Sequence, residues 1–273
     1  MDTPQAPRVE ARALLKQKMK REPSRLLVWL VKRLICQDWY NRAFAAMWPA
    51  EGVDFMVRSL RYLGVTVTAH GLENLPPAGT RCTFVCNHPL GGVDVLAAVS
   101  VVAPRYPEGL LIPANDLLAQ VPALRPLIIP VNKTGGQSRS LPEAINRAFA
   151  SSSQLMFYPS GKVSRRHPDG IYDDAWQKNF VVKSVEYDRV VVPILIEARN
   201  SRFFYALAAW RKRLGVRLNL EMLLLPREVR GQRGKTLRLT VGEPIPAARF
   251  DASRPPAAWA EEVRRSVYAL ARS

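Results

Sequence analysis

The sequence predicts an α/β fold in which a central, largely parallel sheet is flanked by helices. From residue 64 onward, short runs rich in Val, Ile and Phe alternate with helical stretches, as in folds with a parallel sheet. The run 82–86, apolar except for Thr83, and the run 192–196 are typical of buried strands. A chain of 273 residues with 48% hydrophobic content can also bury a sizeable core. We expect an N-terminal helical unit over 1–63 and an α/β domain over 64–273.

The expected elements follow in chain order. Helices are expected at 8–21, 24–49 and 53–63, with Pro23 as a break and Ser24 as an N-cap. The expected strands are 64–69, 82–87, 109–113, 127–131, 154–158, 190–196, 218–225 and 236–241. The remaining expected helices are 93–103, 115–120, 138–150, 174–187, 202–213 and 256–272. Because only a short connection joins the last two strands, we expect them to form an antiparallel pair at one edge.

The chain is strongly basic, with a formal charge of +17 and a pI of about 10.4, so a polyanionic partner is expected. Residues 8–33 hold nine Lys or Arg against two acids, and Trp29 lies within an aliphatic run there. Such basic amphipathic segments suit a bilayer interface, and this one is a predicted membrane-docking motif. The alternative is a packed helix pair with solvated charges. Cations around Trp210 and Leu214 offer a second membrane contact, with the same alternative.

Other partner classes lack support in the sequence. We expect no nucleic-acid partner, because the chain has no helix-turn-helix, zinc-finger or RNA-recognition signature and its basic residues are dispersed. A non-catalytic basic module that binds nucleic acid or anionic lipid stays the alternative from another class. Cys82 and Cys86 share one predicted strand and are expected to be small core residues rather than a disulfide or a metal site; with Cys36 they make three cysteines, which fits a reducing, cytoplasmic setting. No transmembrane span or signal peptide is expected, since the apolar runs are too short.

The segment 87–94, Asn-His-Pro-Leu-Gly-Gly-Val-Asp, carries the first chemical signal. His88 follows a predicted strand directly, and Asp94 stands at the start of the next helix. A neutral imidazole can take a proton from a hydroxyl, while a carboxylate holds its tautomer. The alternative is a turn histidine with Asp94 as a helix N-cap.

Two later strand ends carry polar groups as well. The segment 157–166 ends a strand in a turn that contains Ser160, Gly161, Lys162, Ser164 and Arg165, and it can bind a phosphate or carboxylate. The alternative is a solvated basic loop. Asn132 and Lys133 follow another strand in the same way. Ligands of parallel sheets lie beyond the carboxyl ends of the strands, so these residues are expected to share one crevice with His88.

In combination these motifs resemble the PlsC-like glycerolipid acyltransferases over about residues 64–245. The resemblance rests on the Asn-His turn with its Asp, the later Phe-x-Pro-x-Gly turn with basic residues, and the Val-Pro-Ile strand at 192–194. The segments 87–94, 159–165, 197–205 and 219–222 further resemble the bacterial lyso-aminolipid O-acyltransferases, which make glycine and ornithine lipids and are often labelled hemolysin-like.

The resemblance implies O-acyl transfer from an acyl-carrier-protein or coenzyme A thioester to the hydroxyl of a lyso-lipid. His88 would be the general base and Asp94 would orient it. Asn87 and the turns at Gly91, Gly92 and Gly161 would bind substrate, with backbone N–H groups of these glycines stabilising the oxyanion. Lys162 and Arg165 would hold the acceptor's acidic headgroup or the donor's phosphates. No metal or cofactor is implied, and the site of action would be the cytoplasmic face of the bacterial inner membrane, reached peripherally.

The chain departs from the broad family at three points. Five residues separate His88 from Asp94, where the family has four, and the Gly-Gly pair would have to widen the turn to restore the contact. Ser160-Gly161-Lys162-Val163 replaces Glu-Gly-Thr-Arg, and Asn132 with Lys133 replaces an expected arginine. These changes favour an N-(3-hydroxyacyl) amino acid as acceptor over 1-acylglycerol 3-phosphate, the alternative.

Overall fold

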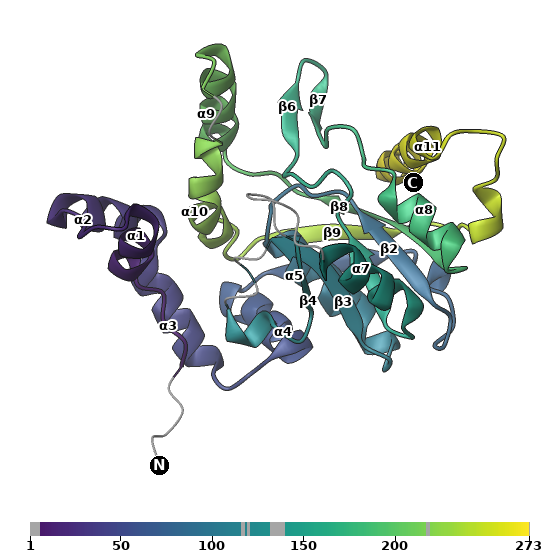
Figure 1. Cartoon of the computed structure of the whole chain (residues 1–273), viewed down its shortest axis with the longest axis horizontal. Helices are drawn as coiled ribbons and strands as arrows, with labels where there is room; N and C mark the ends of the chain where they lie inside the picture. Colours follow the sequence, from purple (N-terminus) through teal and green to yellow (C-terminus); the bar gives the residue numbers. More distant parts are fainter. Residues whose placement is uncertain (1–5, 116–117, 119–120, 132–139, 217–218, 273) are drawn as a thin grey trace.

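A seven-stranded sheet forms the centre of the molecule, with the strand order β1-β9-β8-β2-β5-β3-β4 (Figure 1). The computed structural model describes residues 6–115, 118, 121–131, 140–216 and 219–272. The strands are β1 (Thr66–His70), β2 (Cys82–Cys86), β3 (Leu110–Asn115), β4 (Ile128–Val131), β5 (Gln154–Phe157), β8 (Val190–Glu197) and β9 (Thr236–Val241). Five of them run parallel, while β9 pairs antiparallel with β8 and parallel with β1. The predicted fold class, a largely parallel sheet flanked by helices, is confirmed.

Helices cover both faces of the sheet. On one face, α4 (Gly52–Leu63) and α5 (Val93–Val102) pack Met56 and Val99 against Phe84 and Ile194. On the other face lie α7 (Ser140–Ala150), α8 (Asn179–Glu186) and α11 (Pro256–Ala269). The middle strand β2 is fully buried along its length because helices cover it on both sides. The sheet therefore holds the carboxyl end of β2, where the loop 87–94 begins, on a rigid base.

The N-terminal helices α1 (Ala11–Met19), α2 (Arg25–Leu34) and α3 (Gln37–Met47) form an arm beside α4 (Figure 1). The arm is joined to the core through α3, whose Trp39 packs with Leu60 and Leu90. By contrast, α2 has no buried residue and leaves Trp29 53% exposed and Leu26 66% exposed.

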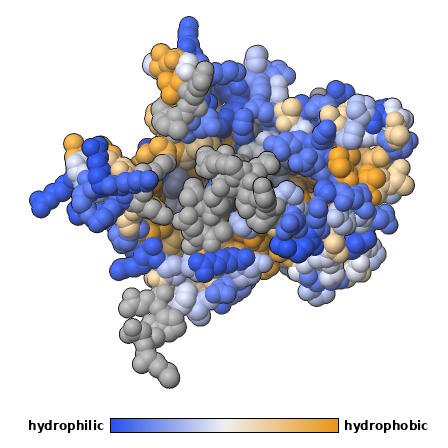
Figure 2. Space-filling model, viewed as in Figure 1, coloured by the Kyte–Doolittle hydropathy of each residue, from blue (hydrophilic) through white to orange (hydrophobic). Residues whose placement is uncertain are grey.

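A second exposed apolar surface lies on α9 (Arg202–Arg213), which projects from the body of the molecule (Figure 1). Trp210 is 71% exposed and Leu214, just beyond the helix, is 73% exposed. Hydrophobic atoms are visible at the projecting end of this helix among hydrophilic neighbours (Figure 2). In the described part of the chain, no helix combines the length and the apolar character that crossing a bilayer requires.

Three predicted elements differ from the structure. The helix expected at 24–49 is two helices, because Cys36 adopts a left-handed conformation (φ 52°) that turns the chain. The strand expected at 218–225 is wrong: a 3₁₀ helix (Leu220–Leu224) and α10 (Leu225–Arg230) lie there, and the antiparallel partner of β9 is β8. Glu221 explains this, since its buried carboxylate faces two arginines inside the fold.

The helix expected at 174–187 begins only at Asn179. The indole of Trp176 donates to the buried Asp173 at 3.1 Å and holds the preceding residues in a loop. Just before it, β6 (Arg165–His167) and β7 (Gly170–Tyr172) form a hairpin that the sequence interpretation missed, although Pro168, Asp169 and Gly170 are typical turn residues. The helix expected at 115–120 lies almost entirely outside the described residues.

Candidate active site

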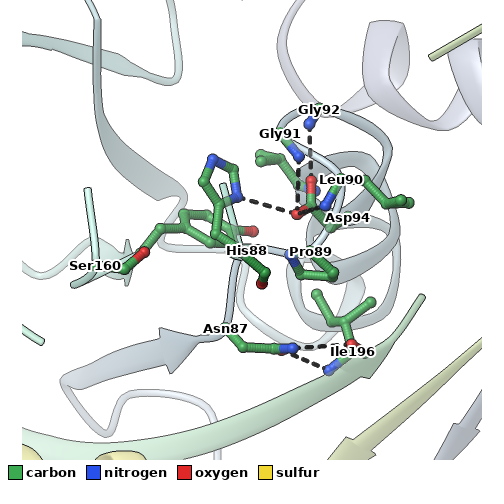
Figure 3. A network of polar contacts seen from close by, with 12 residues as sticks. Asn87, His88, Pro89, Leu90, Gly91, Gly92, Asp94, Ser160 and Ile196 are labelled. Carbon is green, nitrogen blue, oxygen red and sulfur yellow. Dashed lines mark hydrogen bonds and ion pairs between the residues drawn. The ribbon is translucent and has the colours of Figure 1, made fainter. Parts of the chain in front are cut away.

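Asn87 fixes the start of the loop that leaves β2 (Figure 3). Its side chain is 4% exposed and forms two bonds with the backbone of Ile196 on the neighbouring strand β8. The Oδ1 atom accepts from the Ile196 N–H at 2.7 Å, and Nδ2 donates to the Ile196 carbonyl at 2.9 Å. Because both ends of the amide are engaged, Asn87 positions the loop and is not the substrate contact that the sequence suggested.

His88 and Asp94 are in contact, with 3.0 Å between Nδ1 and Oδ2 (Figure 3). The Asp94 carboxylate is fully buried. Four backbone N–H groups donate to it at 2.8–3.2 Å, those of Leu90, Gly91, Gly92 and Val95. Burial acts to raise the pKa of Asp94, but His88 and the backbone donors outweigh it, so the pKa lies below its ordinary value of 3.8.

The state of Asp94 decides the tautomer of His88. An ionised carboxylate can only accept, so Nδ1 of the neutral imidazole carries the proton and Nε2 is the basic nitrogen. The imidazole side chain is 18% exposed, whereas its partner is fully buried. The pair therefore has the arrangement of a general base with an orienting carboxylate.

The Gly-Gly pair accommodates the additional residue between His88 and Asp94. Gly91 has a φ of 80°, in the left-handed region that favours glycine. A Cβ atom there would lie 2.7 Å from Cγ2 of Val163, closer than real contacts allow. The prediction that glycine widens this turn agrees with the 3.0 Å contact that results.

The expected oxyanion donors are engaged elsewhere. The N–H groups of Gly91 and Gly92 point to Asp94, and the N–H of Gly161 donates to the carbonyl of Tyr158 at 2.9 Å. The expectation that these amides stabilise an oxyanion is therefore wrong for this geometry. Two of them instead keep Asp94 ionised.

Asp173 is a central residue that the sequence interpretation missed. It is 1% exposed and receives the backbone N–H of His88 at 3.2 Å. Its carboxylate also accepts from the hydroxyl of Ser164 and the indole N–H of Trp176, and its backbone N–H donates to the hydroxyl of Tyr268. Burial raises the pKa of Asp173, and these hydrogen bonds only partly oppose that effect.

The aromatic ring of Tyr158 packs against the His88 imidazole. The two ring centroids are 4.6 Å apart with a 43° angle between the planes. Tyr158 directly follows β5, the strand next to β2, so a rigid element positions its ring. The Tyr158 ring restricts the rotation of the imidazole. The sequence analysis did not identify this contact.

The basic loop 159–166 divides into engaged and exposed groups. Ser164 binds Asp173, and its N–H donates to the His88 carbonyl at 2.8 Å, so it positions the base. Ser160 donates to the Lys162 carbonyl at 2.6 Å and lies beside His88 (Figure 3). The Lys162 side chain is exposed, which leaves it available to a ligand.

Arg165 does not fit its expected role as a ligand contact. Its guanidinium donates to Glu221 at 3.1 Å and is 15% exposed. Arg211 binds the same carboxylate at 2.8 Å. Because a buried acid already neutralises it, Arg165 ties the loop to the segment after α9. Asn132 and Lys133 lie outside the described residues, and within the described ranges no cluster of His, Cys, Asp or Glu could hold a metal ion.

Comparison with known proteins places the sequence in a family. A family model described as Acyltransferase matches residues 12–273, nearly the whole chain. The chain belongs to the acyltransferase family. An acyltransferase transfers an acyl group from a donor to an acceptor.

Two curated relatives of this acyltransferase carry a more specific name. The lyso-glycine lipid O-acyltransferase of Phocaeicola vulgatus is 43% identical over 246 residues, which cover 90% of this chain and 88% of that protein. The lyso-glycine lipid O-acyltransferase of Bacteroides thetaiotaomicron is 40% identical over 246 residues, with 90% of each chain covered.

A solved structure agrees in fold. The 1-acyl-sn-glycerophosphate acyltransferase PlsC from Thermotoga maritima superimposes with a TM-score of 0.51, covering 96% of this chain and 88% of that chain. Its sequence identity is 18%, so the likeness extends to the fold and not to the substrate.

Proposed function

We propose that this acyltransferase moves a fatty acyl group from a thioester donor to the hydroxyl of a lyso-aminolipid, N-(3-hydroxyacyl)glycine or a close analogue. The observation that carries the proposal is the 43% identity with a lyso-glycine lipid O-acyltransferase over nearly the full length of both chains. The donor is acyl carrier protein or coenzyme A carrying the acyl group. The loss of the family's Glu-Gly-Thr-Arg pattern at 160–163 supports an acceptor other than 1-acylglycerol 3-phosphate.

In the proposed mechanism, Nε2 of His88 accepts the proton of the acceptor hydroxyl as its oxygen attacks the thioester carbonyl. Asp94 stabilises the imidazolium that forms and keeps the ring oriented. When the tetrahedral intermediate collapses, the carbon–sulfur bond breaks and His88 returns the proton to the leaving thiolate. The products are an ester and a free thiol. Because the thioester is already activated, the reaction requires neither a metal nor a covalent enzyme intermediate.

The test is acyl transfer by purified protein, with lyso-glycine lipid or 1-acylglycerol 3-phosphate as acceptor and acyl carrier protein or coenzyme A thioester as donor. We expect an ester of the glycine lipid, and we expect His88→Ala to lower turnover by about a hundredfold or more, the usual contribution of a general base. His70→Ala is the matched control, since His70 is exposed on the edge strand β1. If the enzyme acylated only 1-acylglycerol 3-phosphate, the proposed glycine-lipid acceptor would be wrong.

We further propose that the enzyme works as a peripheral protein at the cytoplasmic face of the inner membrane. Exposed apolar side chains on α2 and at the end of α9 support this, because each set stands beside basic residues. Interfacial tryptophans with cations nearby suit an anionic lipid surface. A lipid acceptor would reach the site from that surface.

A further inference from the structure

A cavity of about 440 Å³ lies beyond the carboxyl end of β8, between the hairpin β6–β7, the start of α9 and α10. The two strands β2 and β8 are parallel neighbours, so the cavity opens at the same edge of the sheet as the His88 loop. Of the basic loop 159–166, only its last residue, Arg166, lines the cavity.

The lining of the cavity is strongly basic. It contains five cationic side chains, those of Arg166, Arg199, Arg202, Arg227 and Lys235. The salt bridges formed within the described part of the chain involve none of these five. The acid in the lining, Glu228, is occupied, since its two oxygens accept from the backbone N–H and the hydroxyl of Ser201 at 2.7 Å each. Five cations against one carboxylate leave the lining with a net positive charge, which favours an anionic ligand.

Asn200 supplies a second, independent feature. It lines the cavity, is 5% exposed, and its Oδ1 atom has no hydrogen-bond partner. The rest of Asn200 is tied down: its Nδ2 donates to the carbonyl of Pro89 at 3.2 Å, and its backbone N–H donates to the hydroxyl of Tyr205 at 3.2 Å. A buried acceptor that lacks a donor is rare and costly in folded proteins. A ligand with an N–H group would satisfy it.

We propose that this cavity binds the headgroup of the acceptor. The arginines of the cavity lining bind its carboxylate, and Oδ1 of Asn200 accepts a hydrogen bond from its amide N–H. The inference rests on the proposed function and deepens it, because an N-acylglycine carries a carboxylate one carbon away from an amide N–H. A phosphate group matches the cations but offers no N–H. Asn200 also binds Pro89, which directly follows His88, so a headgroup seated here has its acyl chain beginning beside the base.

The experiment compares a charged acceptor, N-(3-hydroxyhexanoyl)glycine, with its uncharged methyl ester. The variant Arg199→Gln/Arg227→Gln removes two exposed cations of the cavity lining and leaves the buried Asn200 in place. We expect the KM for the acid to rise about tenfold or more, as for lost charge-assisted hydrogen bonds. The KM for the ester and the KM for the thioester donor should not change. Arg230→Gln is the matched control, because Arg230 is exposed on the same helix and does not line the cavity.

Three results would overturn the inference: an equal rise in KM for acid and ester, a rise in KM for the donor alone, or the same effect in Arg230→Gln. Should the wild-type enzyme acylate neither acceptor, the proposed function fails and the cavity is tested by equilibrium binding of the acid. Tighter binding of the acid to wild type than to the double variant then supports the cavity as a carboxylate site. Equal binding to both proteins contradicts it.

Discussion

Replacing Gly91 by alanine tests whether the widened turn is what joins His88 to Asp94. Gly91 has a φ of 80°, and an added Cβ would lie 2.7 Å from Cγ2 of Val163 and 3.1 Å from Cδ2 of Leu225. The left-handed backbone costs an alanine about 1–2 kcal/mol. Overpacking against Val163 adds about 1–3 kcal/mol. We therefore expect Gly91→Ala to lose roughly 2–5 kcal/mol of the free energy of unfolding.

The same substitution should slow acyl transfer beyond its effect on stability. The N–H of Gly91 donates to Asp94, so a shift of the loop that relieves the clash moves the carboxylate away from the imidazole. A displacement of about 1 Å in a catalytic group can cost about a hundredfold in rate. Urea unfolding gives the stability, and turnover at saturating substrate, under conditions in which the protein is folded, gives the rate.

Two further variants make this prediction sharp. Gly92→Ala is the comparison variant, because the φ of Gly92 (−173°) lies outside the left-handed region and its Cβ would meet only Cγ2 of Val229, at 3.1 Å. Adding Val163→Ala to Gly91→Ala removes the closest steric contact and should restore part of the stability, but not the part due to φ or to the contact with Leu225. If Gly91→Ala matched Gly92→Ala in both stability and turnover, the reasoning about the turn would be refuted.

The remaining predictions concern the carboxylate and the membrane surface. Asp94→Asn should lower turnover about a hundredfold or more, by loss of the orienting charge. Asp94→Asn should also lower the free energy of unfolding above about pH 4, where Asp94 is ionised in both the folded and the unfolded state. Because the pKa of Asp94 in the folded state lies below 3.8, this deficit should shrink as the pH falls through that lowered value. Urea unfolding midpoints between about pH 7 and pH 3 test this expectation. Trp29→Ser with Trp210→Ser should weaken binding to anionic vesicles in a sedimentation assay, while turnover of a water-soluble acceptor is kept. Undiminished vesicle binding would remove both surfaces from the account.

Local patterns were enough to predict the centre of the fold and the contact between His88 and Asp94. The run 82–86 is apolar except for Thr83, which predicted a buried strand, and His88 follows shortly after its end. The spacing of His88 and Asp94 is also local, so the glycines between them indicated how the contact could form. Strong periodicity and turn chemistry are properties of neighbouring residues, and sequence analysis reads them directly.

The errors and omissions arise where distant segments meet. Leu218, Leu220, Met222 and Leu224 alternate with other residues as in a strand, but Glu221 between them is buried against Arg165 and Arg211 from elsewhere in the chain. Asp173 looks like an ordinary loop residue until Ser164 and Trp176 are seen to bind it. The amides of Gly91 and Gly92 were expected to face substrate, and only the position of Asp94 shows where they point.

The central claim is that the His88–Asp94 pair activates a lipid hydroxyl for attack on a thioester. The most direct measurement is mass spectrometry of the product formed by wild type, His88→Ala and His70→Ala from lyso-glycine lipid and an acyl thioester. The account predicts the diacylated glycine lipid, with release of free thiol in equal amount, from wild type and His70→Ala, and almost none from folded His88→Ala. Product from His88→Ala at the wild-type rate would contradict it.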